Sequence, residues 1–313
     1  FRAGDELDSV KAVFRYTENP TDPLLLKRIE GDHSGLSGRF WPDGTIRVAG
    51  REYNGLLESA CYQKGHMSCL SCHSMHDYAD TNDQLSAEIQ GDESCLQCHR
   101  DFENHLEQHT HHVPDSSGSR CLNCHMPHTT YGLFSAIRSH RIDNPSVRVS
   151  VESGRPNACN LCHLNRTLEW SGQYLNEWYG QPLVELDQDE RTIAASILWM
   201  LKGDAVQRTI LAWHLGWEAA QEASGSAWMA PYLAHLLTDP YSATRQVAYR
   251  ALIGFPGFQA FDYDYLAPRS ELTRKATEAT ERWLGLGGPD RAGPHLLMAE
   301  NGEFAIDEWL RLL

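Results

Sequence analysis

The pentapeptide Cys-x-x-Cys-His occurs four times between residues 69 and 163 of this chain, and it limits the possible folds more than any other feature. This spacing is typical of c-type haem attachment: the two sulfurs bond to the vinyl groups of one porphyrin, and the histidine reaches the iron as proximal ligand. The sequence therefore predicts four covalently bound c-type haems. Their thioether residues would be Cys69, Cys72, Cys95, Cys98, Cys121, Cys124, Cys159 and Cys162, and their proximal ligands His73, His99, His125 and His163.

The cysteine count leaves little room for other chemistry. Eight of the nine cysteines lie in the motifs, and only Cys61 is left over. Two Cys-x-x-Cys pairs can also form a four-sulfur zinc site, but zinc does not require a histidine after every second cysteine. Four such histidines favour haem. We expect Cys61 to be a small buried residue; a position near an iron or an intermolecular disulfide is the alternative.

The motifs are too closely spaced for an ordinary hydrophobic core. They start at residues 69, 95, 121 and 159, so successive starts are 26, 26 and 38 residues apart. Porphyrin faces would have to replace the core, with short helices and loops around them. The predicted fold class is mainly α with much coil, and we expect the haem-free form not to fold, as in metal-dependent domains.

Composition divides the chain into three parts. Residues 1–60 are expected to lead into the haem domain, with a short β-hairpin over 39–48 around Pro42-Asp43-Gly44. Residues 61–165 would form the tetrahaem core. Residues 166–313 lack cysteine and show helical apolar spacing. There Asp204 and Asp239 lie 35 residues apart at predicted turns, where each would cap a helix. This spacing indicates two copies of a HEAT-like helical repeat, and an ordinary helical bundle is the alternative.

The second axial ligand decides what each haem can do. Two protein ligands leave a haem that only transfers electrons, whereas an open sixth position binds small molecules. His76 follows His73 too closely to reach the opposite face of the same porphyrin, but it could serve an adjacent haem. His105, His109 and His112 have the spacing of one helix face, with His111 beside them.

Other candidates for this position are weaker. His128 repeats the three-residue offset after a motif, and His140 lies alone between the third and fourth motifs. Met67, Met75 and Met126 could give sites of raised potential, but the supply of histidine makes them unnecessary. The histidines of the helical part are not expected to be ligands; they are His214, His235 and His295.

The chain resembles bacterial multihaem c-type cytochromes of the doubled-CxxCH class, which often carry a helical-repeat tail. The resemblance lies in residues 52–59, 68–76, 109–112 with 117–118, 124–127, 138–140 and 156–170. It implies that the distal ligands are His76, His109, His112 and His140, without saying which of them serves which haem. It also makes His128 a weaker candidate for a distal ligand. In similar proteins a segment like 1–7 follows an earlier haem-bearing stretch, so one of these histidines would be free for a haem outside this chain.

The net charge and the expected location limit the kinds of partner that the protein can have. The net charge of −15 disfavours nucleic acid and anionic membranes and suits a basic redox partner, although it would also serve solubility alone. Haem attachment of this type takes place outside the cytoplasm, so a periplasmic or extracellular location is expected. No signal peptide and no apolar run of about 18 residues is visible.

Two functions follow from these expectations. The first is an electron conduit through closely spaced, mostly bis-histidine haems, with redox proteins or further haem-bearing chains as partners and self-assembly as an option. In that case no residue is catalytic. The second is an oxidoreductase of the multihaem nitrite reductase or hydroxylamine oxidoreductase type, with one open haem. The Cys-x-x-Cys-Lys motif of such enzymes is absent from this sequence.

Overall fold

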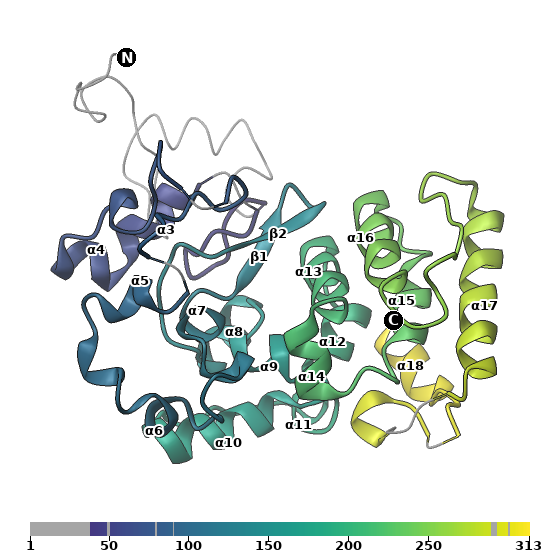
Figure 1. Cartoon of the computed structure of the whole chain (residues 1–313). Helices are drawn as coiled ribbons and strands as arrows, with labels where there is room; N and C mark the ends of the chain where they lie inside the picture. Colours follow the sequence, from purple (N-terminus) through teal and green to yellow (C-terminus); the bar gives the residue numbers. More distant parts are fainter. Residues whose placement is uncertain (1–37, 49–50, 79, 90, 289–292, 300) are drawn as a thin grey trace, which may run out of the picture.

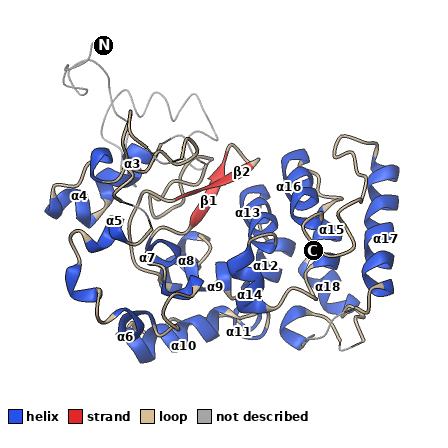
Figure 2. Cartoon of the chain, viewed as in Figure 1, coloured by secondary structure: helices blue, strands red, loops and turns tan. Residues whose placement is uncertain are grey.

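The described part of the chain is mainly helical. The computed structural model describes residues 38–48, 51–78, 80–89, 91–288, 293–299 and 301–313 (Figure 1). Within these ranges it has sixteen α-helices and one two-stranded sheet (Figure 2). The predicted class, mainly α with a small β element, is confirmed. The segment 1–7, on which one expectation rests, lies outside the described residues.

The motif-bearing half consists of short helices joined by long loops. In motifs 69–73, 95–99 and 159–163, the histidine N–H donates to the carbonyl of the first cysteine at 2.8–2.9 Å, so each motif is one closed helical turn. Short 3₁₀ turns cover 69–71, 100–102 and 117–119. The helices are α3 (Glu52–Glu58), α4 (Ala60–Gly65), α5 (Glu93–Leu96), α6 (Leu106–Thr110), α7 (Cys121–His125), α8 (Val147–Ser153), α9 (Ala158–Cys162) and α10 (Leu168–Tyr179).

The sheet lies between the two halves of the molecule (Figure 1). Strand β1 (His128–Tyr131) pairs antiparallel with β2 (Ser135–Arg138), with Thr129 opposite Ile137. Strand β1 also contacts α13 (Ala205–Leu215), a helix of the second half. The hairpin predicted over 39–48 is present as a tight turn with one antiparallel bridge, from Phe40 to Ile46. Local sequence signals do not predict β1 and β2. Their link contains Gly132 at φ 58°, in the left-handed region that glycine adopts with less strain than any other residue.

The second half is built from helix pairs around a conventional core. Its largest fully buried side chains include Trp228, Tyr232, Phe258 and Phe261. A 3₁₀ turn covers 294–296. The helices are α11 (Gln188–Thr192), α12 (Ala195–Leu201), α13 (Ala205–Leu215), α14 (Glu218–Ser224), α15 (Ala230–Leu236), α16 (Ser242–Leu252), α17 (Arg269–Gly285) and α18 (Ile306–Leu312).

Residues 35 positions apart meet in this half. Thr209 on α13 and Thr244 on α16 share a buried hydrogen bond of 2.8 Å. Asp204 caps α13 by accepting from the backbone N–H of Val206 at 2.8 Å, which confirms its predicted role. Asp239 accepts from the N–H of Tyr241 at 2.7 Å, but Tyr241 is itself the N-cap of α16 and no side chain caps that helix. The predicted helix cap is therefore present at Asp204 and wrong for Asp239.

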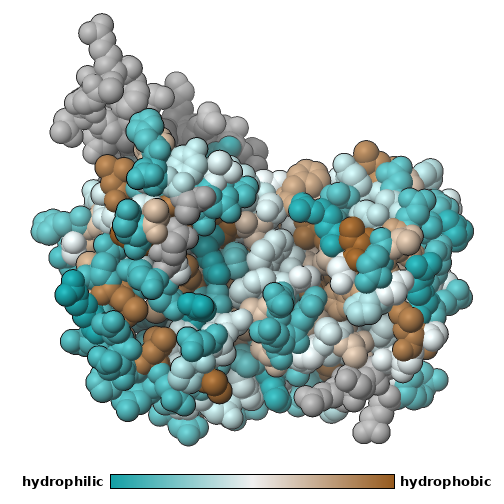
Figure 3. Space-filling view, viewed as in Figure 1, coloured by the Kyte–Doolittle hydropathy of each residue, from teal (hydrophilic) through white to brown (hydrophobic). Residues whose placement is uncertain are grey.

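Hydrophobic burial is distributed very unequally along the chain. Between Leu57 and Val147, Pro127 is the one described aliphatic or aromatic side chain that is buried, whereas both clusters of buried apolar side chains lie between Val147 and Leu312. Large apolar groups in the motif-bearing half are instead exposed, among them Leu70, Met75 and Val113. Figure 3 shows apolar side chains at the surface of this half. The protein chain alone therefore supplies no core for residues 58–146.

Candidate haem-ligand site

Three of the four motif histidines face a second histidine across a gap of constant width. The ring centroids of His73 and His140 are 6.1 Å apart, with 23° between the ring planes. His125 faces His109 at 6.1 Å and 6°, and His163 faces His112 at 6.0 Å and 28°. Each pair joins a predicted proximal histidine to a predicted distal one.

This gap has the width that one metal ion requires. A metal–imidazole bond is about 2.0–2.1 Å long, and the nitrogen lies roughly 1.1 Å from its ring centre, so two trans imidazoles have centroids about 6.3 Å apart. Ring pairs without a metal cover the same range, from His111 on Trp178 at 4.3 Å to Tyr232 on Trp309 at 5.9 Å, so what distinguishes the three pairs is that each joins two histidines at this width. The three pairs therefore fit a six-coordinate iron between them.

The rings are held by the nitrogen that such a metal would not use. Nδ1 of His112 lies 2.6 Å from the carbonyl of Thr110. Nδ1 of His125 lies 2.9 Å from the carbonyl of Asp143, and Nδ1 of His140 lies 3.0 Å from the carbonyl of Arg138. A proton on Nδ1 leaves the Nε2 lone pair available, which is the usual outer-shell arrangement of metal-bound histidine.

Burial favours the neutral ligand form of several of these rings. It lowers the pKa of His163 to about 4, helped by the nearby His112 and Arg166. Burial also lowers the pKa of His109 and of His140. A neutral imidazole is the form that binds a metal.

The backbone at His140 is placed by close packing against α3. A β-carbon on Gly55 would lie 2.7 Å from the backbone nitrogen of Arg141, so only glycine permits this approach. The Arg141 guanidinium donates to the carbonyl of Asp43 at 2.5 Å and lies 3.8 Å from the carboxylate of Glu58. The 39–48 turn thus helps to hold His140 opposite His73.

The segment 109–112 supplies one ring to each of two pairs. The predicted single helix face for His105, His109 and His112 is wrong: α6 ends at Thr110, and His111 takes a left-handed conformation at φ 56°. This turn redirects His112 toward His163 while His109 faces His125. His112 also lies against Gly118, where any β-carbon would clash with its imidazole.

The motif cysteines lie next to one another in chain order. The thiols of Cys72 and Cys95 are close enough to interact electrostatically, and Cys121 donates to Cys95 in a hydrogen bond that lowers the Cys95 pKa to about 7. Cys124 is likewise close to Cys162, whose pKa burial raises to about 12. The four attachment points form one continuous row.

Hydrogen bonds between the motifs support the same row. The side chain of Gln97 donates to the carbonyl of Ser71 at 3.1 Å, which joins the first two motifs. Asp92 accepts from the backbone N–H of Cys121 at 2.9 Å, which joins the second and third. The roles of Asp92 and Gly118 were missed. The only sequence signal for either was the Ser117-Gly118 pair within the stretches of resemblance.

Two predicted ligands are not brought to a partner. His99 is exposed, and its one ring contact among the described residues is Phe102, at 6.3 Å. His76 is also exposed, and within the described ranges it makes no ring contact or hydrogen bond. His33 lies outside these ranges. Cys61, expected to be buried, is half-buried because α4 exposes most of its surface, and burial raises its pKa.

The remaining histidines of this half have other neighbours. His128 packs against Trp213 at 4.3 Å, Trp217 at 5.0 Å and His214 at 5.6 Å, so it connects β1 to α13 rather than to a motif. Burial lowers the pKa of His128 far below its ordinary value. His105 is exposed.

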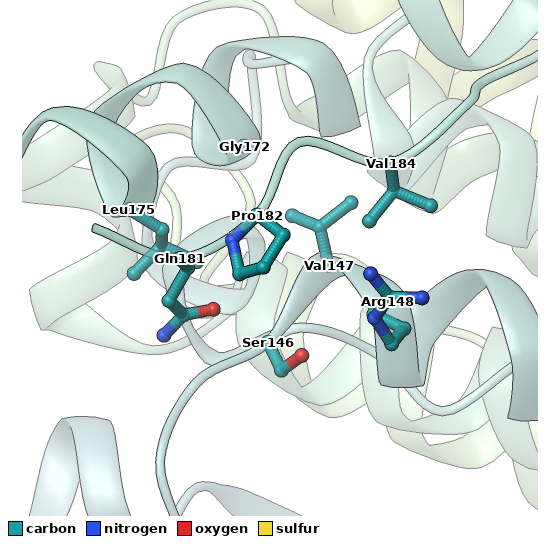
Figure 4. Close-up of a pocket in the computed structure, with 8 residues that line it drawn as sticks. All are labelled: Ser146, Val147, Arg148, Gly172, Leu175, Gln181, Pro182 and Val184. Carbon is teal, nitrogen blue, oxygen red and sulfur yellow. The ribbon is translucent and has the colours of Figure 1, made fainter. Parts of the chain in front are cut away.

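A pocket between α8 and α10 does not coincide with this site. It is lined by Val147, Leu175 and Pro182 together with Gln181, whose amide donates to the carbonyl of Pro145 (Figure 4). None of the predicted ligands lines it. Among the described residues, no group of three or more His, Cys, Asp or Glu side chains is arranged to hold a bare metal ion. A haem iron requires only two protein ligands.

Comparison with known proteins adds no relative. No protein-family model, curated protein or solved structure matches the chain. In the described part, no helix is both long enough and apolar enough to cross a bilayer.

Proposed function

We propose that this chain is a multihaem c-type cytochrome that transfers electrons through four haems, located outside the cytoplasm. The observation that carries the proposal is the set of three imidazole pairs at 6.0–6.1 Å, each joining a motif histidine to a predicted distal ligand. The proposed pairs are His73 with His140, His125 with His109, and His163 with His112.

The missing core supports the same assignment. Among the described aliphatic and aromatic side chains of residues 58–146, Pro127 alone is buried, although a stretch of this length needs apolar burial to offset its conformational entropy. Four porphyrins would supply that surface and would cover exposed side chains such as Leu70 and Met75.

Each group of residues has a definite task in this proposal. Bound haem supplies the one-electron iron couple. The cysteines fix each group by two bonds, the paired histidines saturate the iron and keep substrates out, and the row of attachment points keeps neighbouring groups close. Saturated, closely spaced sites are suited to electron transfer.

A second candidate function rests on His99. No histidine of the described residues lies opposite this ring, so its haem would have an open face unless His76 or an outside residue supplied the ligand. An open face would allow small-molecule reduction or oxidation of the nitrite reductase or hydroxylamine oxidoreductase type. Carbon monoxide binding by one haem per chain in the reduced protein would favour this candidate.

We also propose that the second half is a short HEAT-like repeat array. The 35-residue correspondence between Thr209 and Thr244, which touch across α13 and α16, supports this. The array would offer its surface to a redox partner or to further haem-bearing chains.

The function is tested by electron exchange with a basic partner. The haem-loaded chain, with its net charge of −15, should show four haems by intact mass. When reduced, it should pass electrons to a basic single-haem cytochrome c, at a rate that falls as salt screens the attraction. Fewer than four haems, or haems that stay reduced with that acceptor, would contradict the proposal.

A further inference from the structure

Helix α10 carries a row of aromatic side chains along the imidazole pairs. Trp170, Tyr174 and Trp178 are four residues apart and therefore share one face. Their rings are in contact, with centroids 4.8 and 4.7 Å apart. Trp170 contacts His163 at 4.9 Å, and Trp178 lies 6.4 Å from His112. The row thus runs from one member of an imidazole pair to the other.

The last turn of α10 contacts the segment 109–112 directly. The hydroxyl of Tyr179 donates to the backbone carbonyl of His109 at 2.6 Å. The indole of Trp178 is stacked on His111 at 4.3 Å, with 10° between the planes. Figure 1 shows α6 beside α10, although about 60 residues separate them in the sequence.

The segment has little else to hold it on this side. α6 has five residues, too few for a helix to be stable alone, and none of its own residues is buried. On the other side, Ser119 donates to the carbonyl of His112 at 3.2 Å and lies 3.3 Å from the Thr110 hydroxyl. The contacts of Trp178 and Tyr179 on α10 therefore hold the segment 109–112 on the side that Ser119 does not.

We infer that Trp178 and Tyr179 are positioning residues that hold the segment 109–112, so that His109 faces His125 and His112 faces His163. This rests on the proposed function, in which these rings are haem ligands. Because one segment serves two pairs, loosening it should release distal ligands from two neighbouring haems.

The test uses the haem-loaded full chain with Trp178→Ala and, separately, Tyr179→Phe. We expect Trp178→Ala to keep its covalent haems but to gain a high-spin ferric signal and, when reduced, to bind carbon monoxide at about two more haems per chain than the wild type. Added imidazole should restore the low-spin spectrum, because it fills the vacated position. Tyr179→Phe, which loses one hydroxyl, should show the same change at smaller amplitude.

Matched controls separate positioning from general damage. Trp178→Phe keeps a ring against His111 and should stay low-spin. Tyr241→Phe removes a half-exposed hydroxyl from the second half and should match the wild type. If both test variants keep the wild-type spin state and carbon monoxide binding, this inference alone is wrong. If the wild type itself lacks low-spin haem, the proposed function fails and the inference falls with it.

Discussion

At the scale of single residues, the site depends on small groups that leave room for rings or fix their direction. Gly118 lies so close to His112 that a β-carbon would clash with the imidazole. The carbonyls of Thr110, Asp143 and Arg138 each bind one Nδ1 and so leave the Nε2 of that ring available as a ligand. Such details decide whether a histidine can be a ligand.

Substitution of Gly118 by Ala should therefore displace His112. We expect a variant with four covalent haems, one of which becomes high-spin in the ferric state, visible by electron paramagnetic resonance. The control is Gly172→Ala on α10, where the added carbon would make only an ordinary contact of 3.9 Å with Val147. A Gly118→Ala protein with an unchanged spectrum would remove His112 from the ligand set.

His214 should make the second half sensitive to acid. It is fully buried, and burial lowers its pKa to about 3, with the charge of Arg138 acting in the same direction. Below about pH 6.5 the unfolded chain binds a proton that the folded chain does not. As the pH falls from 6.5 to 3, His214 alone should thus lower the free energy of unfolding by roughly 1.4 kcal/mol per pH unit. The neighbouring His128, whose pKa burial also lowers, acts in the same direction.

Denaturant titrations across this pH range would measure the effect. His214→Gln should flatten the dependence, because glutamine does not titrate. His295→Gln is the matched control, since His295 has the same kind of Nδ1–carbonyl contact but is exposed. Equal slopes for both variants would show that His214 does not carry the acid sensitivity.

At the scale of elements, the helix pairs of the second half are joined by a buried ion pair. Arg208 of α13 binds Asp239, which lies before α16, at 2.5 and 3.2 Å, and Asp239 is 5% exposed. Removing one partner of such a pair leaves a half-buried charge without compensation, which costs far more than breaking a surface pair.

Asp239→Ala should therefore destabilise the protein by about 3–5 kcal/mol, measured as a shift in the free energy of unfolding. Glu271→Ala breaks the exposed pair with Arg274 and serves as the control; it should cost far less, because water screens a surface pair. Similar costs for the two variants would mean that the pair does not hold α13 to α16.

The elements also show what the sequence could and could not predict. The motifs, the helical second half and the cap at Asp204 follow from local patterns, because spacing and turn chemistry are written in neighbouring residues. The end of α6 at His111 and the strands β1 and β2 do not, since they depend on distant contacts. His128 shows the same limit: its offset from a motif is local, but its contacts with Trp213 and Trp217 are not.

The distal ligands form an intermediate case. His109, His112 and His140 were chosen from their residue type and from a resemblance, and each faces a motif histidine. The order of pairing depends on the turn at His111 and on the approach of Gly55 to Arg141, neither of which spacing reveals. His76 was chosen on the same grounds and has no partner among the described residues.

At the scale of the whole molecule, the two halves should differ in their dependence on haem. Among the described aliphatic and aromatic side chains of residues 58–146, Pro127 alone is buried, whereas the second half has its own core. A chain with its eight motif cysteines changed to alanine should be open to protease in the first half. The second half should remain resistant. Protection of both halves would contradict the view that haem replaces the core.

The central claim is that three histidine pairs each enclose one haem iron. Quantitative electron paramagnetic resonance of the ferric, haem-loaded chain tests it most directly, because it counts haems by spin state and ligand type. We predict at least three low-spin bis-imidazole haems per chain, one fewer in each of His109→Ala, His112→Ala and His140→Ala. Fewer than three in the wild type, or no loss in these variants, would contradict the claim.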